Sequence, residues 1–223
     1  MTDACVETLR VLGHELRRPL TVIRGASTLL VDDIDALPPD SRRQMLTLID
    51  RSAAAMADLV DDVQTAVHLE SGDLEYDLEA LDLAALVADA VESARRADPD
   101  RSVEVRGLDG LEVRADREQA VRALRALLVN ALHFSPDAAI VEVVASQDAD
   151  AVRVEVLDRG PGLPAADRER AFEKFTRLDP HRGGAGLGLF LARRLARGMG
   201  GEVSVADRED GGTAACFTLR HRG

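Results

Sequence analysis

Apolar residues in the first seventy positions recur at the spacing of amphipathic helices. Leu9, Leu16, Ile23 and Leu30 repeat every seven residues, which places them on one face of a helix. A second series repeats at intervals of three and four residues, which is typical of a helix seam. It comprises Leu46, Ile49, Ala53, Met56, Val60, Val63 and Val67. Pro38 and Pro39 separate the two series and prevent one continuous helix. The pattern therefore predicts a hairpin of two long helices over residues 1–72.

The apolar seams of such a hairpin would be only half covered in a single chain. Two copies that associate as a four-helix bundle would close the seams, and we therefore expect a homodimer. The alternative is an amphipathic hairpin that packs only against the rest of its own chain. Ser71-Gly72-Asp73 ends the second helix, so we place the domain boundary between residues 72 and 73.

After residue 73 the pattern changes to short strand-like runs among helices. Because strands and helices intermix without regular β-α-β alternation, we expect an α+β domain, with helices layered on a mixed sheet. Helices are expected over 83–97, 117–134 and 187–198, and strands over 102–106, 111–115, 139–145, 151–157, 202–206 and 213–220.

Composition removes several function classes. The chain has 223 residues and a net charge of −12, which argues against non-specific nucleic-acid binding and against docking on an anionic membrane. No apolar run approaches the roughly 18 residues of a membrane-spanning helix. We expect no membrane contact by this segment, although a longer protein that contains it could be membrane-anchored. Cys5 and Cys216 lack metal-ligand spacing and suggest reduced thiols in the cytoplasm.

His14 is the first candidate for chemistry. At roughly 100° per residue it lies nearly opposite the first seam and should face solvent. Glu15 follows directly, and Pro19 lacks the N–H that would bond to the carbonyl of Glu15, so we expect the helix to bend there. An exposed imidazole beside a carboxylate suits a nucleophile, although a plain surface histidine fits the same pattern.

Two glycine-rich segments are candidates for ligand binding. Residues 158–162, Asp-Arg-Gly-Pro-Gly, follow a strand, and glycines there allow the backbone to approach a ligand while the aspartate accepts from an exocyclic amine. Residues 183–189 open a helix whose N–H groups can face phosphate oxygens. Each segment alone is also typical of an ordinary turn. Asn130 and His133 lie away from the buried stripe of their helix, and the Asn130 amide oxygen suits Mg²⁺.

These segments together, in this order, resemble the sensor histidine kinases of two-component systems. Residues 12–20, Leu-Gly-His-Glu-Leu-Arg-Arg-Pro-Leu, match the phospho-acceptor box of that family. Asn130 falls in its N box, residues 158–162 are its first glycine box, residues 172–175 its phenylalanine box and residues 184–189 its second glycine box. The resemblance covers about residues 5–220.

The resemblance implies a dimeric hairpin domain over residues 1–72 and an α/β sandwich ATP-binding domain, with a mixed sheet and helices on one face, over residues 73–223. It implies a kinase that autophosphorylates His14 from ATP, with Glu15 as proton acceptor. The phosphoryl group would then pass to an aspartate in the receiver domain of a response regulator.

The resemblance also implies the residues that bind ATP and Mg²⁺. Asn130 would coordinate Mg²⁺, Asp158 would read the adenine amino group, Phe134 would line the adenine pocket and Arg177 would reach the phosphates. Residues 163–183 would form a lid over the nucleotide. The full ATP-binding set is Asn130, His133, Phe134, Asp158, Gly160, Gly162, Arg177, Gly184, Gly186, Leu187 and Gly188.

The chain departs from the family pattern at four positions. Arg18 replaces the usual Thr or Asn and cannot accept a hydrogen bond from a hydrolytic water, which argues against phosphatase activity. His133 replaces a lysine that contacts phosphate, which predicts modest ATP affinity. Ala126 replaces the water-activating glutamate of related ATPases, which disfavours an ATPase or chaperone-like machine. Gly13 loosens the helix beside His14. These departures leave a second hypothesis open, a degenerate kinase that acts as a nucleotide-binding dimeric scaffold without autophosphorylation.

Overall fold

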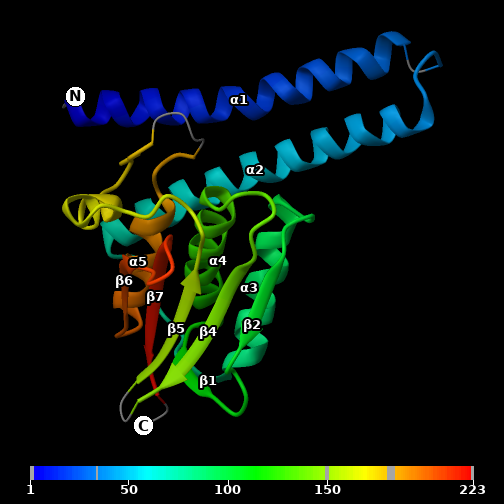
Figure 1. Cartoon of the computed structure of the whole chain (residues 1–223). Helices are drawn as coiled ribbons and strands as arrows, with labels where there is room; N and C mark the ends of the chain where they lie inside the picture. Colours follow the sequence, from blue (N-terminus) through cyan, green and yellow to red (C-terminus); the bar gives the residue numbers. More distant parts are fainter. Residues whose placement is uncertain (1–2, 34, 149–150, 180–183, 222–223) are drawn as a thin grey trace.

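The first two helices form a long hairpin in the computed structural model, which describes residues 3–33, 35–148, 151–179 and 184–221. α1 spans Asp3–Asp33 and α2 spans Pro39–Ser71, and the two helices run side by side in opposite directions (Figure 1). α1 continues through Pro19, so the missing N–H does not end the helix. The predicted hairpin is confirmed.

Local sequence explains both ends of α2. Pro39 begins the helix, where a residue without an N–H loses no intrahelical bond. Gly72 follows the last turn with φ at 78°, and its N–H donates to the carbonyl of His68. This left-handed conformation is one that glycine adopts at little cost.

The rest of the chain folds around a mixed five-stranded sheet. The strand order is β2-β4-β5-β7-β6, in which β2 and β4 are parallel and the other neighbours antiparallel. A second, two-stranded sheet pairs β1 with β3. The strands are β1 (Glu79–Asp82), β2 (Val103–Arg106), β3 (Glu112–Ala115), β4 (Val141–Gln147), β5 (Ala151–Leu157), β6 (Glu202–Asp207) and β7 (Thr213–Arg220).

Three helices cover one face of the larger sheet (Figure 1). They are α3 (Leu83–Ala97), α4 (Arg117–Phe134) and α5 (Gly188–Gly198), and two short 3-10 turns, Ala165–Asp167 and Arg170–Phe172, precede α5. Asp82 caps α3 and Asp116 caps α4, each by accepting from the backbone N–H three residues on. Such caps satisfy N–H groups that have no partner within the helix.

The core lies between these helices and the sheet. The predicted stripe on α4 is buried, and so are the alternate residues of β4 and β5. The expected hairpin, mixed sheet and helix layer are therefore confirmed, whereas β1 was not expected. Among the described residues, no helix is long and apolar enough to span a membrane.

Candidate active site

His14 and Glu15 are neighbours on α1 with opposite surroundings. The side chain of His14 is exposed, as the sequence predicts, whereas Glu15 is only 8% exposed. A carboxylate is costly to bury unless other groups compensate its charge. The partners of Glu15 therefore identify what covers this part of α1.

Two of the groups that cover Glu15 come from the predicted lid and from the residue that follows it. The Arg177 guanidinium Nη1 lies 3.2 Å from Glu15 Oε1, and the backbone N–H of Gly184 donates to Oε2 at 3.0 Å. Arg18 adds a third contact, with its Nη1 3.8 Å from Oε2. A carboxylate has about four acceptor sites, so Glu15 can accept a further hydrogen bond in addition to these contacts. The sequence places Arg177 near the phosphates, and the structure places it on Glu15.

Asp158 anchors the first glycine segment at the end of β5. It is 7% exposed, and its Oδ1 accepts from the N–H groups of Gly160 at 2.8 Å and Thr213 at 2.9 Å. Neither bond uses Oδ2, which is the atom available to an amine ligand. A larger residue at position 160 would crowd the neighbouring backbone, because a Cβ there would lie 3.0 Å from the Phe134 carbonyl oxygen.

The end of α4 lies against this glycine segment. The Ser135 hydroxyl accepts from the backbone N–H of Arg159 at 3.1 Å. Phe134 is half-buried, and the exposed His133 ring meets it edge-on, with centroids 5.3 Å apart. Gly162 adopts a left-handed φ of 77°. The predicted adenine-site residues of the two segments are thus brought together.

Asn130 lies beside the N-terminus of α5. A Cβ built on Gly188, the first residue of α5, would lie 3.8 Å from Asn130 Nδ2 and 3.9 Å from its Oδ1. The N–H groups of a helix N-terminus and its dipole favour a negative charge. An amide oxygen next to this terminus fits a magnesium ion held mainly by phosphate oxygens and water.

No metal cluster competes with that arrangement in the described part of the chain. Among those residues, no three His, Cys, Asp or Glu side chains gather as a metal site.

The second glycine segment is locked to the phenylalanine box. The Phe175 N–H donates to the Gly186 carbonyl at 2.9 Å, and Phe175 has a φ of 62°, which is unusual for a residue with a side chain. A Cβ on Gly186 would lie 2.6 Å from the Thr176 carbonyl oxygen. Leu187 is buried just before α5. Packing therefore requires a glycine at position 186. Residues 180–183 of the predicted lid lie outside the described residues.

The hairpin also contacts the second domain along α2. Arg125 of α4 forms an ion pair with Asp58 of α2. Burial raises the pKa of Asp62 to about 6, although Arg125 and Arg122 partly oppose this shift. The sequence did not predict this junction, because no local pattern distinguishes Asp58 and Asp62 from the other charged residues of a helix. By contrast, the sequence could have predicted the pair of Glu15 and Arg18, because residues three positions apart are neighbours on a helix.

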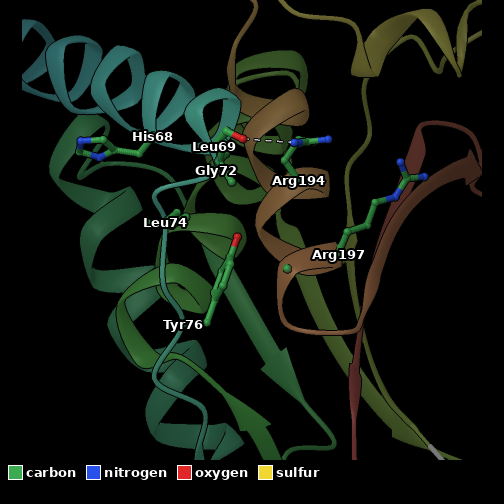
Figure 2. Close-up of a pocket in the computed structure, with 8 residues that line it drawn as sticks. His68, Leu69, Gly72, Leu74, Tyr76, Arg194 and Arg197 are labelled. Atoms are coloured by element: carbon green, nitrogen blue, oxygen red, sulfur yellow. Dashed lines mark hydrogen bonds between the residues drawn. The ribbon is translucent and has the colours of Figure 1, made fainter.

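A separate cleft lies where α2 leads into the second domain, with a volume of about 320 Å³. Figure 2 shows Tyr76 on the segment that follows α2, with its ring directed toward α5, the helix that carries Arg194 and Arg197. The lining residues are His68, Leu69, Gly72, Leu74, Tyr76, Arg194, Arg197 and Gly198. They differ from the predicted ATP-site residues, so this cleft belongs to the domain junction.

Two family models match the chain in the predicted order. The His Kinase A (phospho-acceptor) domain matches residues 6–72. The model described as Histidine kinase-, DNA gyrase B-, and HSP90-like ATPase matches residues 115–223. The mycobacterial sensor histidine kinase MprB, a solved structure, is 30% identical with a TM-score of 0.59, covering 66% of this chain and 99% of that one.

The chain belongs to the sensor histidine kinase family.

Other relatives agree with this membership. SenX3 of Mycolicibacterium smegmatis, a sensor-like histidine kinase, is 28% identical over 93% of this chain and 55% of its own length. The full-length ShkA structure in complex with AMPPNP is 29% identical with a TM-score of 0.62, covering 96% of this chain and 45% of that one. The chain thus spans about half the length of these relatives. The family carries an ATP-binding domain, and the comparisons support the histidine kinase interpretation over the degenerate scaffold.

Proposed function

We propose that this chain is the catalytic core of a two-component system. It transfers the γ-phosphoryl group of ATP to His14 and then passes it to an aspartate in the receiver domain of a response regulator. One observation carries the proposal most directly. Glu15, the neighbour of an exposed histidine, is held by Arg177 and Gly184, which border the lid of the nucleotide-binding half.

The ATP site consists of the two glycine segments and the end of α4. Asp158 Oδ2 accepts from the adenine amino group, while Gly160 and Gly162 give the ligand close access to the backbone. Phe134 lines the adenine pocket, and His133 and Arg177 contact the phosphates. Asn130 would hold Mg²⁺ beside Gly188, the first residue of α5, and the phosphates would lie against the preceding segment with Gly184, Gly186 and Leu187. The close approach of Asn130 to Gly188 supports this placement.

The residues around His14 act mainly by positioning the reacting groups and by neutralising their charge, and few of them react themselves. Phosphoryl transfer depends mainly on alignment and charge stabilisation. One ring nitrogen of His14 forms the bond to the γ-phosphorus as the bond to the bridging oxygen breaks, and ADP leaves with that electron pair. The proton on the other ring nitrogen passes to Glu15. Mg²⁺ supplies charge neutralisation on the phosphates when it is bound.

The hairpin, residues 1–72, is the dimerisation and phospho-acceptor domain, and residues 73–223 are the ATP-binding domain. Leu9, Leu46 and Val67 of the two seams are exposed in the single chain. A second copy would bury them in a four-helix bundle. This supports a homodimer.

Incubation with γ-labelled ATP and Mg²⁺ tests the proposal. We expect label on the protein that is lost in acid and kept in alkali, which distinguishes phosphohistidine from phosphoserine. His14→Gln should abolish the label, and His68→Gln, a change at another exposed histidine of the hairpin, should leave it unchanged. A wild-type chain that binds ATP but takes no label would contradict the proposal and favour the scaffold.

Arg18 makes the chain a poor phosphatase toward its partner. Its guanidinium lies beside Glu15 and has no acceptor for a hydrolytic water. Arg18→Thr should speed the decay of the phosphorylated regulator by about tenfold, roughly the value of one hydrogen bond in the transition state. Arg17→Thr, a change at the adjacent exposed arginine, is the matched control. A decay that is already fast in the wild type would refute this role of Arg18.

A further inference from the structure

The contacts of Glu15 join two distant parts of one chain. Arg177 and Gly184 follow Glu15 by 162 and 169 positions, and both reach its carboxylate within a single subunit. Arg177 of the predicted lid and Gly184 therefore lie against the helix turn that carries His14 of the same chain. Whether the nucleotide half serves its own histidine or that of a partner depends on how firmly this arrangement is held.

An apolar cluster holds the two halves together. Ala66 of α2 packs with Leu187 and Leu191, and all three are at most 5% exposed. The partly buried residues around them come from both halves: Val63, Leu69, Phe175, Ala185 and Phe190. Because Leu187 and Phe175 belong to the second glycine segment and the phenylalanine box, the base of the lid itself rests on the α2 helix of its own chain.

Polar contacts surround this cluster. Asp58 pairs with Arg125 of α4, and Glu70 pairs with Lys174 of the phenylalanine box. Arg194 donates to the Leu69 carbonyl at 3.4 Å, the contact drawn in Figure 2. Contacts at several points along α2 fix both the orientation of the second domain relative to the hairpin and its distance from the hairpin.

The connection between the halves is short. α2 ends at Ser71, and Leu74, Tyr76 and Leu78 already pack against the core of the second domain. Tyr76 is fitted closely, because a Cβ on Gly198 would lie 2.1 Å from its ring and hydroxyl. Only residues 72 and 73 are left as a tether, and two extended residues span about 7 Å. The domain therefore cannot move far from the end of its own hairpin.

We propose that autophosphorylation occurs within one subunit, so that ATP bound by one chain phosphorylates His14 of that same chain. The inference rests on the proposed function and adds which subunit's histidine receives the phosphoryl group. The Glu15 contacts bring the lid to its own phospho-acceptor turn, and the cluster around Ala66 and the short tether keep it there.

Mixed dimers carrying two different affinity tags test the direction. In the split dimer, one subunit has His14→Gln and the other has Asn130→Asp. In the coupled dimer, one subunit has both changes and the other is wild type, so the two dimers have the same overall composition. Each is isolated by sequential purification on both tags and incubated with γ-labelled ATP and Mg²⁺. Asp158→Asn provides a second nucleotide-site variant in place of Asn130→Asp.

The coupled dimer should take about half the label of the wild-type dimer, and the split dimer should fall to the level of the two mutant homodimers. Label on the split dimer, with the coupled dimer at the level of the mutant homodimers, would overturn this inference alone and show transfer between subunits. A wild-type dimer that binds ATP without taking label would overturn the proposed function, and this inference with it.

Discussion

The hairpin and the ATP-binding half bury their apolar residues very differently. In the second half, Leu83, Leu86 and Phe217 have no exposed surface and lie in one continuous core. In the hairpin, Leu46 is 59% exposed and Val31 is 80% exposed. Among the described residues, the largest fully buried side chains all belong to the second half.

This difference separates a unit that closes its own core from one that does not. Burial of apolar surface contributes about 25 cal/mol per Å², so a sheet covered by three helices gains most of that energy within one chain. Two helices alone can cover only one side of each other. The hairpin therefore depends on a second surface for stability, and the same mutation type should act differently in the two regions.

Removal of a large side chain from the closed core should have the largest effect. Phe217→Ala on β7 should lower the free energy of unfolding of the ATP-binding half by about 3–5 kcal/mol, because it leaves a cavity that the packed neighbours cannot fill. Denaturant unfolding followed by circular dichroism measures the change, and it should not depend on protein concentration. A loss below 1 kcal/mol would show that this core is loosely packed.

Leu46→Ala is the corresponding change in the hairpin. We expect the dimer dissociation constant to rise by at least about tenfold, since each subunit loses a side chain that is buried only in the dimer. Sedimentation velocity over a concentration series gives this constant. Gln44→Ala, an exposed polar position on the same helix, should leave it unchanged. Equal effects of the two variants would place Leu46 outside the interface.

Asp158→Asn tests whether nucleotide recognition belongs to the second half alone. The amide keeps an Oδ1 for the Gly160 and Thr213 N–H groups but replaces the charged Oδ2. A hydrogen bond to a charged group contributes about 1.5–3 kcal/mol, so ATP should bind about 10- to 100-fold more weakly by calorimetry. Asp210→Asn, at an exposed turn, serves as the control. Unchanged affinity would remove Asp158 from the site.

The smallest effect is expected where the two regions meet. Burial against α4 raises the pKa of Asp62 to about 6, so the docked state binds the Asp62 proton more tightly than the undocked state does. Docking is then strongest at low pH and weakens as the pH rises through about 6 and the buried carboxylate ionises.

Energy transfer between dyes on α1 and β6 should report this docking equilibrium. Between pH 5 and 7.5 the docking equilibrium constant should fall by about tenfold in the wild type, because pH 5 lies one unit below the pKa of the buried carboxyl and one pKa unit corresponds to a tenfold change. Asp62→Asn should remove most of that dependence, and Asp50→Asn, a change at an exposed carboxylate of the same helix, should retain it. A pH profile identical in all three proteins would exclude Asp62 as its source.

The elements that local patterning predicts well are those with a complete periodicity. α4 occupies the expected range 117–134 because its apolar stripe and the Asp116 cap lie in the same short segment. β5 occupies 151–157 because buried and outward residues alternate along its whole length. β1 was not predicted, since Leu81 is its one buried residue and its pairing with β3 depends on residues about 30 positions away.

The candidate site divides in the same way. The sequence by itself determined the helices, the two seams, the exposure of His14 and the glycine segments, because each depends on residues close along the chain. Only the tertiary structure decided that Glu15 is buried, that Arg177 and Gly184 contact it, and that Asp58 pairs with Arg125 of α4. Those contacts join positions more than 50 residues apart, and their energy comes from packing two separately folded regions. Periodicity along the chain carries no information about such packing.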